Sequence, residues 1–232
     1  MSSYLFEPPQ VQTIPVTGEV AAFPINRIFC VGRNYAAHAA EMGAEVDREA
    51  PFYFTKSPMA KLDSGATLRY PPGTQDCHYE MELVLVIGKP VFRGTVEDAG
   101  AAIYAYGCGL DMTRRDLQQI GKDKRRPWDL GKDFEGAAVF APLTKAEVFG
   151  RPDAQTIHLK VNGDVRQRAQ LKDMVHSVEE IIADLSKYYH LVPGDVIMTG
   201  TPAGVGPVQP GDVLTGGIDG LQPIELTISD PE

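Results

Sequence analysis

The chain has 232 residues, of which 43% are apolar and 23% charged, and its formal net charge is −9 at pH 7. Such a chain can bury a sizeable core, and its acidic balance argues against a nucleic-acid or anionic-membrane partner. No apolar run approaches the roughly 20 residues that span a bilayer, and no signal-peptide pattern opens the sequence. The cysteines (Cys30, Cys77 and Cys108) form neither a CxxC pair nor a disulfide framework. We therefore expect reduced thiols and a cytoplasmic protein.

The amino-terminal part is predicted to form short strands joined by turns. Residues 1–26 are rich in proline, valine and threonine, and we expect two lead-in strands there, at 10–16 and 19–23. A strand at 27–31, a short helix at 35–42 closed by Gly43, and a strand at 51–57 follow. On that helix His38 and Glu41 are three residues apart and lie on one face.

Residues 77–87 are predicted to form a single strand that ends before Pro90. Side chains alternate faces along a strand, so Glu80 and Glu82 point the same way, roughly 6.5–7 Å apart. Two adjacent carboxylates repel each other and resist burial. A divalent cation between them would relieve both costs, and such oxygen ligands suit Mg²⁺ or Mn²⁺. The alternative is two surface glutamates on an edge strand, each paired with a lysine. We leave His78, at the start of this strand, out of the site.

A third acid stands at the end of the next predicted strand. A capping box at Thr95 starts a helix that reaches about residue 103, and a strand at 104–110 then leads to Asp111. A strand–helix–strand unit can bring two strand ends together, so a Glu/Glu/Asp oxygen site is geometrically reasonable. Equally, Asp111 could cap the helical turn predicted at 114–120. A charged loop follows at 121–127.

The carboxy-terminal half is predicted to be mostly strands. Asn162-Gly163 indicates a hairpin between strands at 156–161 and 165–169. A capping box at Ser177 starts a helix to about residue 189, and strands at 196–199, 213–218 and 223–228 follow. We therefore predict an α+β fold, a β-rich mixed β-roll or barrel-like sheet with few short helices. Residues 27–232 would form one catalytic domain, preceded by the lead-in strands of residues 1–26.

Two further patterns bear on chemistry. A carboxylate that accepts a hydrogen bond from one imidazole nitrogen leaves the other nitrogen free to take a proton from water, so His38 and Glu41 could form a base and its orienter. The alternative is a solvated helix face. Lys132 follows an aromatic loop, where a lone lysine is usually solvated. The dinucleotide, P-loop, GxSxG and HExxH motifs are not met, which argues against a nucleotide-binding enzyme or a serine hydrolase.

The assembled motifs resemble the fumarylacetoacetate hydrolase family from about Arg27 to the C-terminus. They are, in order, Val31-Gly-Arg-Asn-Tyr-Ala-Ala-His38 with Glu41, His78-Tyr-Glu-Met-Glu-Leu83, Gly109-Leu-Asp-Met-Thr113, Lys132-Asp-Phe134, Val161-Asn-Gly163 and Thr199-Gly-Thr-Pro202. The length is similar to that of the compact acylpyruvase branch, and most like its members that act on fumarylpyruvate in gentisate catabolism.

The resemblance implies a role for each candidate residue. Glu80, Glu82 and Asp111 would bind Mg²⁺ or Mn²⁺, and His38 with Glu41 would activate water on a short lid helix. Lys132 would stabilise the oxyanion. The residues expected to line the substrate pocket are Lys56, Arg115, Gln118 and Thr201. The fold implied is a mixed β-roll, usually a homodimer.

The implied reaction is metal-dependent hydrolysis of the C–C bond of a small anionic diketo acid, 3-fumarylpyruvate, to fumarate and pyruvate. Alternatives are another acylpyruvate, decarboxylation of oxaloacetate, isomerisation of an unsaturated diacid, and binding without turnover. The second carboxylate of fumarylpyruvate needs a cation once it is desolvated. The candidates are Arg33, Lys124, Arg125 and Arg126, although a charged loop is more often simply solvated.

Overall fold

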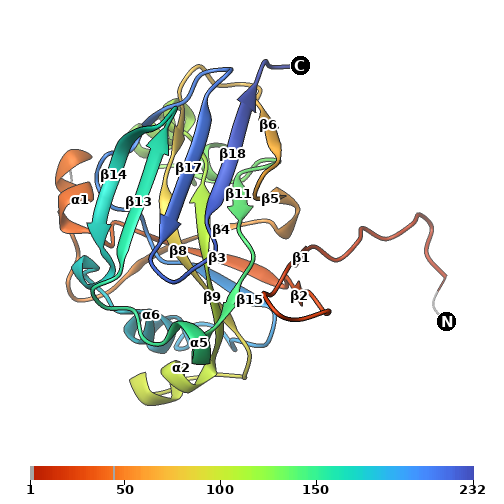
Figure 1. Cartoon of the computed structure of the whole chain (residues 1–232), viewed down its shortest axis with the longest axis vertical. Coiled ribbons are helices and arrows are strands. Elements are labelled where there is room, and N and C mark those ends of the chain that lie inside the picture. Colours follow the sequence, from red (N-terminus) through yellow and green to blue (C-terminus); the bar gives the residue numbers. More distant parts are fainter. Residues whose placement is uncertain (1–2, 44) are drawn as a thin grey trace.

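The computed structural model describes residues 3–43 and 45–232, and short strands make up most of its regular structure (Figure 1). A mixed eight-stranded sheet has the order β4-β3-β15-β8-β9-β11-β5, with β12 beside β9. Its strands are β4 (Phe52–Lys56), β3 (Arg27–Gly32), β15 (Asp195–Met198), β8 (Met81–Ile87), β9 (Ile103–Asp111), β11 (Ala138–Phe140), β5 (Lys61–Asp63) and β12 (Thr144–Lys145). Every residue of β8 is buried, and the apolar run at 83–87 predicts this for most of the strand.

A second, five-stranded sheet curls over the first (Figure 1). Its order is β14 (Asp164–Gln170), β13 (Thr156–Val161), β17 (Val213–Ile218), β18 (Ile224–Ser229) and β6 (Thr67–Arg69). In β13 only alternate residues are fully buried, and these belong to the same hydrophobic core as β8. The predicted hairpin is confirmed, because Asn162 and Gly163 both have positive φ, at 52° and 90°. The predicted β-rich, rolled fold is therefore correct.

The helices are short and lie outside the sheets. They are α1 (Ala36–Glu41), α2 (Val96–Ala102), α3 (Arg115–Asp123), α4 (Asp129–Lys132), α5 (Ala146–Phe149) and α6 (Val178–Leu185), with 3₁₀ turns at Pro58–Ala60 and Leu171–Asp173. Both predicted capping boxes are present, at Thr95 and Ser177. The helix expected to reach 189 ends at Leu185, because Ser186 turns its hydroxyl back to the Ala183 carbonyl and accepts the Gly94 N–H. No helix in the described ranges is long and apolar enough to cross a bilayer.

The single strand predicted at 77–87 is wrong, because the chain breaks at Glu80. β7 (Cys77–Tyr79) joins a separate sheet with β10 (Thr113–Arg114) and β16 (Gly206–Pro207). The neighbouring β9 ends beside this break, where Asp111 donates its backbone N–H to the Glu80 carbonyl at 2.9 Å. The Met81 N–H that the break would leave unpaired donates to the side chain of Gln167 at 3.0 Å. Because this side chain accepts the N–H, the change of sheet leaves no buried backbone donor unpaired at Met81.

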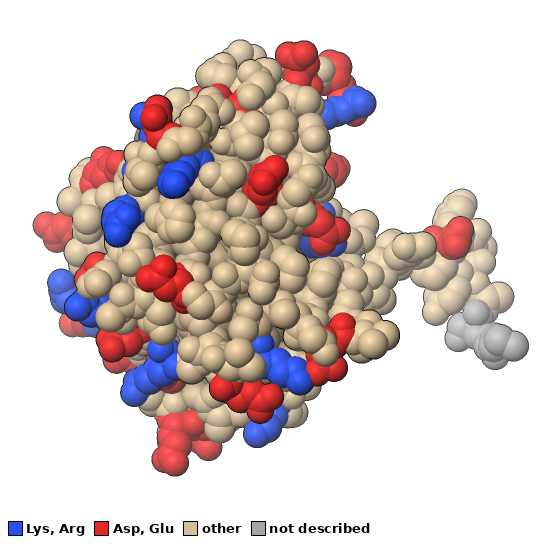
Figure 2. All heavy atoms as spheres, viewed as in Figure 1, with Lys and Arg blue, Asp and Glu red and all other residues tan. Residues whose placement is uncertain are grey.

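The lead-in strands are shorter than predicted. β1 (Thr13–Ile14) and β2 (Phe23–Pro24) pair antiparallel, and Ile14 and Phe23 reach the hydrophobic core of the domain. Residues 3–12, ahead of β1, extend away from the body of the molecule (Figure 1). The cysteines are buried and unpaired. On the face shown in Figure 2, acidic and basic side chains are interspersed rather than segregated.

Candidate metal centre and active site

Three carboxylates meet where β8 begins and β9 ends. β8 and β9 are antiparallel neighbours, with Met81 opposite Leu110, so the start of one strand adjoins the end of the other. Glu80, Glu82 and Asp111 each place one oxygen within 4.8 Å of the others. The glutamates are 5% and 2% exposed, and Asp111 is fully buried. The alternatives of surface glutamates and of an aspartate that caps a helix are therefore wrong; the N-cap of α3 is Arg114.

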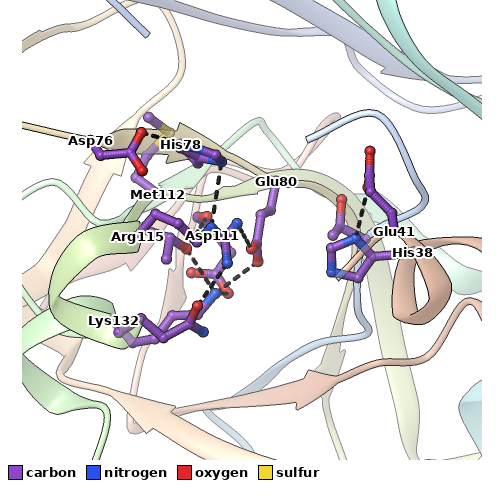
Figure 3. A network of polar contacts seen from close by, with 12 residues as sticks. His38, Glu41, Asp76, His78, Glu80, Asp111, Met112, Arg115 and Lys132 are labelled. Atoms are coloured by element: carbon purple, nitrogen blue, oxygen red, sulfur yellow. Dashed lines mark hydrogen bonds and ion pairs between the residues drawn. The ribbon is translucent and has the colours of Figure 1, made fainter. Parts of the chain in front are cut away.

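Buried cations balance two of these acids (Figure 3). Glu80 accepts from Lys132 at 2.7 Å and from Arg115 at 2.5 Å. Asp111 accepts from Lys132 at 2.7 Å and lies 2.8 Å from the ammonium of Lys56. Burial alone would raise the pKa of Glu80, but Lys132 and Arg115 hold it below its usual range. Glu80 is therefore ionised in the folded protein.

Glu82 has no such partner. Its carboxylate accepts the Gly200 N–H at 2.8 Å, and among the described residues no cation lies within 4.0 Å of it. Burial, and then the charges of Asp111 and Glu80, raise the pKa of Glu82 well above its usual value. Asp111, in contrast, has a cation at each of its oxygens, Lys56 at one and Lys132 at the other. A buried carboxylate that no cation balances, in an all-oxygen set, fits a hard divalent cation such as Mg²⁺ or Mn²⁺.

His38 of α1 lies on the side of this acidic centre, and Glu41 of the same helix lies behind it, away from the acids (Figure 3). His38 is buried, and its Nδ1 lies 3.4 Å from a carboxylate oxygen of Glu41. Glu41 in turn accepts the Gly204 N–H at 3.1 Å. Burial lowers the pKa of His38, and the negative charges of Glu80 and Glu41 only partly oppose this shift. The imidazole is therefore neutral near pH 7 and can accept a proton.

A small cavity joins the acids to the histidine. Its lining consists of Val31, Gly32, Arg33, His38, Met42, Phe54, Glu80, Glu82, Arg115, Gln118, Lys122, Trp128, Lys132 and Thr201. The free volume is about 40 Å³, room for little more than one or two water molecules. Any organic ligand must therefore displace α1 or some of these side chains. A larger hollow beside β6 contains none of the predicted site residues.

Lys132 and Lys56 lie deeper than predicted from the sequence. Lys132 lies on the short helix α4 and is 2% exposed, so the solvated alternative is wrong. Its ammonium donates to both Glu80 and Asp111 and also to Thr113 at 2.8 Å. Lys56 packs behind Asp111, where it donates to backbone carbonyls, and is not part of the cavity lining.

The three remaining predicted residues are on the cavity wall. Gln118 accepts from Arg115 at 2.8 Å and so helps to aim that guanidinium at Glu80. Thr201 accepts from the side chain of Gln167 at 2.8 Å. Because the Thr201 oxygen is used as an acceptor there, its own proton is free to be donated elsewhere.

Sequence reasoning missed Gln167 and Lys122. Gln167 lies in a polar strand and is fully buried. It pairs with Leu159, directly beside a shift in the register between β13 and β14. No sequence motif signals this position. Lys122 was detectable in principle, because residues 115, 118 and 122 share one face of a helix. The predicted helix stopped at 120, whereas α3 continues to Asp123.

Comparison with known proteins agrees with this geometry. A family model described as the C-terminal domain of fumarylacetoacetate hydrolase matches residues 27–229. A fumarylpyruvate hydrolase from Ralstonia is 50% identical over 196 residues, covering 82% of this chain and 100% of the relative. An oxaloacetate tautomerase from Escherichia coli is 40% identical over 204 residues, covering 88% and 93%.

A solved structure matches the whole architecture. The fumarylpyruvate hydrolase of Pseudomonas aeruginosa, in complex with Mn²⁺ and pyruvate, superposes with a TM-score of 0.95 at 41% identity, covering 98% of this chain and all of that one. A similar protein from Burkholderia cenocepacia gives 0.93 at 43% identity, covering 100% of this chain and 97% of that one. Family model, sequence relatives and fold agree, and the chain belongs to the fumarylacetoacetate hydrolase family.

Proposed function

We propose that this protein is a metal-dependent hydrolase that cleaves the C–C bond of an acylpyruvate, with 3-fumarylpyruvate as its substrate in gentisate catabolism. The observation that carries the proposal is one cavity lined by Glu80, Glu82 and His38. The third acid, Asp111, groups with the two glutamates behind the cavity wall, and Glu41 lies beside His38. The names of the relatives from Ralstonia and Pseudomonas support the substrate. We also propose that the protein is cytoplasmic and forms a homodimer. Sedimentation analysis would test the oligomeric state.

Glu80, Glu82 and Asp111 would hold the metal. When bound, Mg²⁺ or Mn²⁺ would act as a Lewis acid toward the carboxylate and 2-oxo oxygens of the diketo acid. Lys56 and Lys132 fix the orientation of Asp111, while Arg115 and Lys132 fix that of Glu80. These contacts set the ligand oxygens in place before the substrate arrives.

His38 acts as the base. Glu41 accepts a hydrogen bond from the Nδ1–H group of His38. This bond fixes the tautomer and leaves the lone pair on Nε2. Nε2 takes a proton from water as the oxygen attacks the distal carbonyl of the diketone. The low pKa of His38 keeps this nitrogen unprotonated near neutral pH.

Lys132 stabilises the oxyanion formed by this attack. Its three ammonium protons are already donated to Glu80, Asp111 and Thr113. One of these bonds must therefore be exchanged for the oxyanion. The C–C bond then breaks, its electron pair leaves with the pyruvate enolate, and a proton added to the enolate carbon releases pyruvate beside fumarate.

The experiment follows the enol absorbance of fumarylpyruvate, acetylpyruvate and a longer acylpyruvate with Mg²⁺ or Mn²⁺, and then with excess EDTA. We expect metal-dependent loss of absorbance, fastest for fumarylpyruvate, with one pyruvate released per substrate. Replacing His38 by Ala should abolish this release. Pyruvate release that EDTA leaves unchanged would contradict the proposal.

A second activity, oxaloacetate tautomerisation, is favoured by the 40% identical relative. Keto–enol exchange needs proton transfer at carbon and no attacking water. Oxaloacetate is therefore assayed beside the acylpyruvates, with its enol absorbance and pyruvate followed together. Absorbance change without pyruvate indicates tautomerisation, whereas pyruvate formation that survives loss of His38 indicates decarboxylation at the metal.

A further inference from the structure

Two cations of the cavity have no carboxylate partner. Arg33 and Lys122 both line it, and in the described part of the chain neither lies within 4.0 Å of an acidic oxygen. The other two cations there, Arg115 and Lys132, are both paired with Glu80. A cavity that holds two unpaired cations attracts a further negative charge.

Lys122 is held in this position at an energetic cost. It is only partly exposed and its ammonium lies 5.2 Å from the centre of the Trp128 ring. Burial lowers its pKa, and the charges of Arg115 and Arg33 lower it further. Because Arg33 lines the same cavity, the two positive charges repel each other there. An anion between Arg33 and Lys122 would offset their mutual repulsion and stabilise the charged form of the partly buried lysine.

Arg33 is held by an anchored turn. Its backbone has φ of 58°, a conformation uncommon for residues other than glycine and asparagine. The next residue, Asn34, is fully buried and donates to the carbonyls of His176 and Thr199 at 3.0 and 2.9 Å. The turn is therefore fixed, and only the side chain of Arg33 has to be ordered when an anion binds.

The two cations lie toward the outer end of the cavity. The triad is buried, whereas Arg33 is exposed and Lys122 is partly exposed. A ligand whose keto acid reaches the triad extends its far end toward them. The loop residues Lys124 and Arg125 are exposed and outside this cavity, and Arg126 lines an adjacent groove with Phe52.

We propose that Arg33 and Lys122 form a subsite for the distal carboxylate of the substrate, so that the enzyme selects dicarboxylic over monocarboxylic acylpyruvates. This rests on the proposed function, because it places the keto-acid end at the triad. A distal carboxylate receives charge-assisted hydrogen bonds from both cations. A neutral distal group leaves both cations without a partner.

The test compares two ligands that differ only in the distal group. 2-Oxoheptanedioate and 2-oxoheptanoate have the seven-carbon chain of fumarylpyruvate, with and without the second carboxylate, and neither has a cleavable diketone. Their affinities are measured by calorimetry with Mn²⁺ present. The wild-type protein should bind the diacid about 10- to 100-fold more tightly.

Lys122→Met and Arg33→Gln should each reduce this preference, and together abolish it, while 2-oxoheptanoate binds as before. Lys124→Met is the matched control, since it removes one positive charge two residues away, outside the cavity, and should keep the preference. Two variants on separate elements guard against one that fails to fold. Equal affinities in the wild-type protein, or a preference untouched by both substitutions, would overturn the subsite.

The same variants are then assayed on fumarylpyruvate and acetylpyruvate. We expect kcat/KM to fall about 10- to 100-fold for fumarylpyruvate and to stay within about twofold for acetylpyruvate. Equal falls for both substrates would contradict selection by these residues. If the diacid preference follows the two cations but no acylpyruvate is cleaved, the hydrolase proposal fails while the subsite stands.

Discussion

The floor and the lid of the cavity are built in opposite ways. On the floor, Glu80, Asp111 and Lys132 are buried, and each contacts at least two oppositely charged groups. The helix α1, which we propose closes over the substrate as a lid, has six residues and no side-chain cap at its start. The carboxylate of Glu41 joins it to the glycine loop after β15, through two 3.1 Å contacts with the Gly204 N–H.

This difference separates two requirements of the chemistry. Carboxylates that hold a metal must be fixed, and buried ion pairs with many hydrogen bonds achieve that. A base that closes over the substrate must instead move, because the cavity of about 40 Å³ admits no diketo acid as it stands. A helix of six residues, of which His38 and Ala39 are buried, opens at low free-energy cost.

The largest expected effects concern the floor, where two glutamates can be compared. Glu80→Gln removes the partner of two buried cations and should lower the free energy of unfolding by about 3–5 kcal/mol. Glu82→Gln removes a buried carboxylate that no cation balances, while the new amide oxygen can still accept the Gly200 N–H. Stability should therefore stay constant or rise. Urea unfolding without metal measures both.

Activity and metal binding provide the other half of this comparison. Both variants should lose at least about 100-fold in activity, and the rise in melting temperature that Mn²⁺ gives the wild-type protein should shrink in both. Equal destabilisation by the two substitutions would show that Glu82 has a partner in the folded protein, and would contradict this account of the floor.

Substitutions in the His38–Glu41 pair (the dyad) should lower the rate and leave the free energy of unfolding nearly unchanged. His38→Ala is expected to lower kcat by about 10²–10⁴-fold and to change the free energy of unfolding by about 1 kcal/mol or less. The pH–rate profile identifies the group. The base is active when unprotonated, and burial lowers its pKa, so wild-type activity should fall with decreasing pH only below about 6.5.

Glu41→Gln tests whether His38 is the group that titrates in this profile. The negative charge and hydrogen bond of Glu41 raise the pKa of His38, so its removal should move the acid limb to lower pH as kcat falls. A limb that stays in place, or moves to higher pH, would show that another group titrates.

The sequence predicted most strands and the triad because these depend on local periodicity. The buried run of β8, the hairpin at Asn162 and both capping boxes are each formed by residues a few positions apart. For Asp111 the sequence left two alternatives, a place beside the glutamates and a helix cap; the structure shows the first, which a strand–helix–strand unit allows. These features need no information from distant parts of the chain.

Features that depend on tertiary contacts were not predictable in this way. The break at Glu80 is tolerated because Gln167, 86 residues further on, accepts the Met81 N–H. Lys132 is buried because Glu80 and Asp111 surround its ammonium, although its local sequence indicates an exposed loop. A polar residue enters the core only when a distant partner satisfies it, and periodicity does not report that partner.

The smallest expected effect on the rate concerns the connection between the lid and the glycine loop. Gly204 has φ of +96°, and a Cβ there would lie 2.0 Å from the Arg166 carbonyl. Gly211 has nearly the same φ, +93°, but no heavy atom within 4 Å of that position. Alanine at either site costs about 1–2 kcal/mol through the left-handed backbone. Only at Gly204 does the overlap add about 1–3 kcal/mol.

The two substitutions should also differ in their effect on kcat. In Gly204→Ala the overlap displaces the N–H that Glu41 accepts, so the dyad loses its connection to the loop and kcat should fall about 10-fold or more. Gly211→Ala should leave kcat within about twofold, because the added Cβ meets no heavy atom within 4 Å. Thermal unfolding and steady-state rates on one substrate measure both variants. If Gly204→Ala lost stability but kept the wild-type kcat, the lid would close without this hydrogen bond, and the fixed floor alone would have to position the reacting groups.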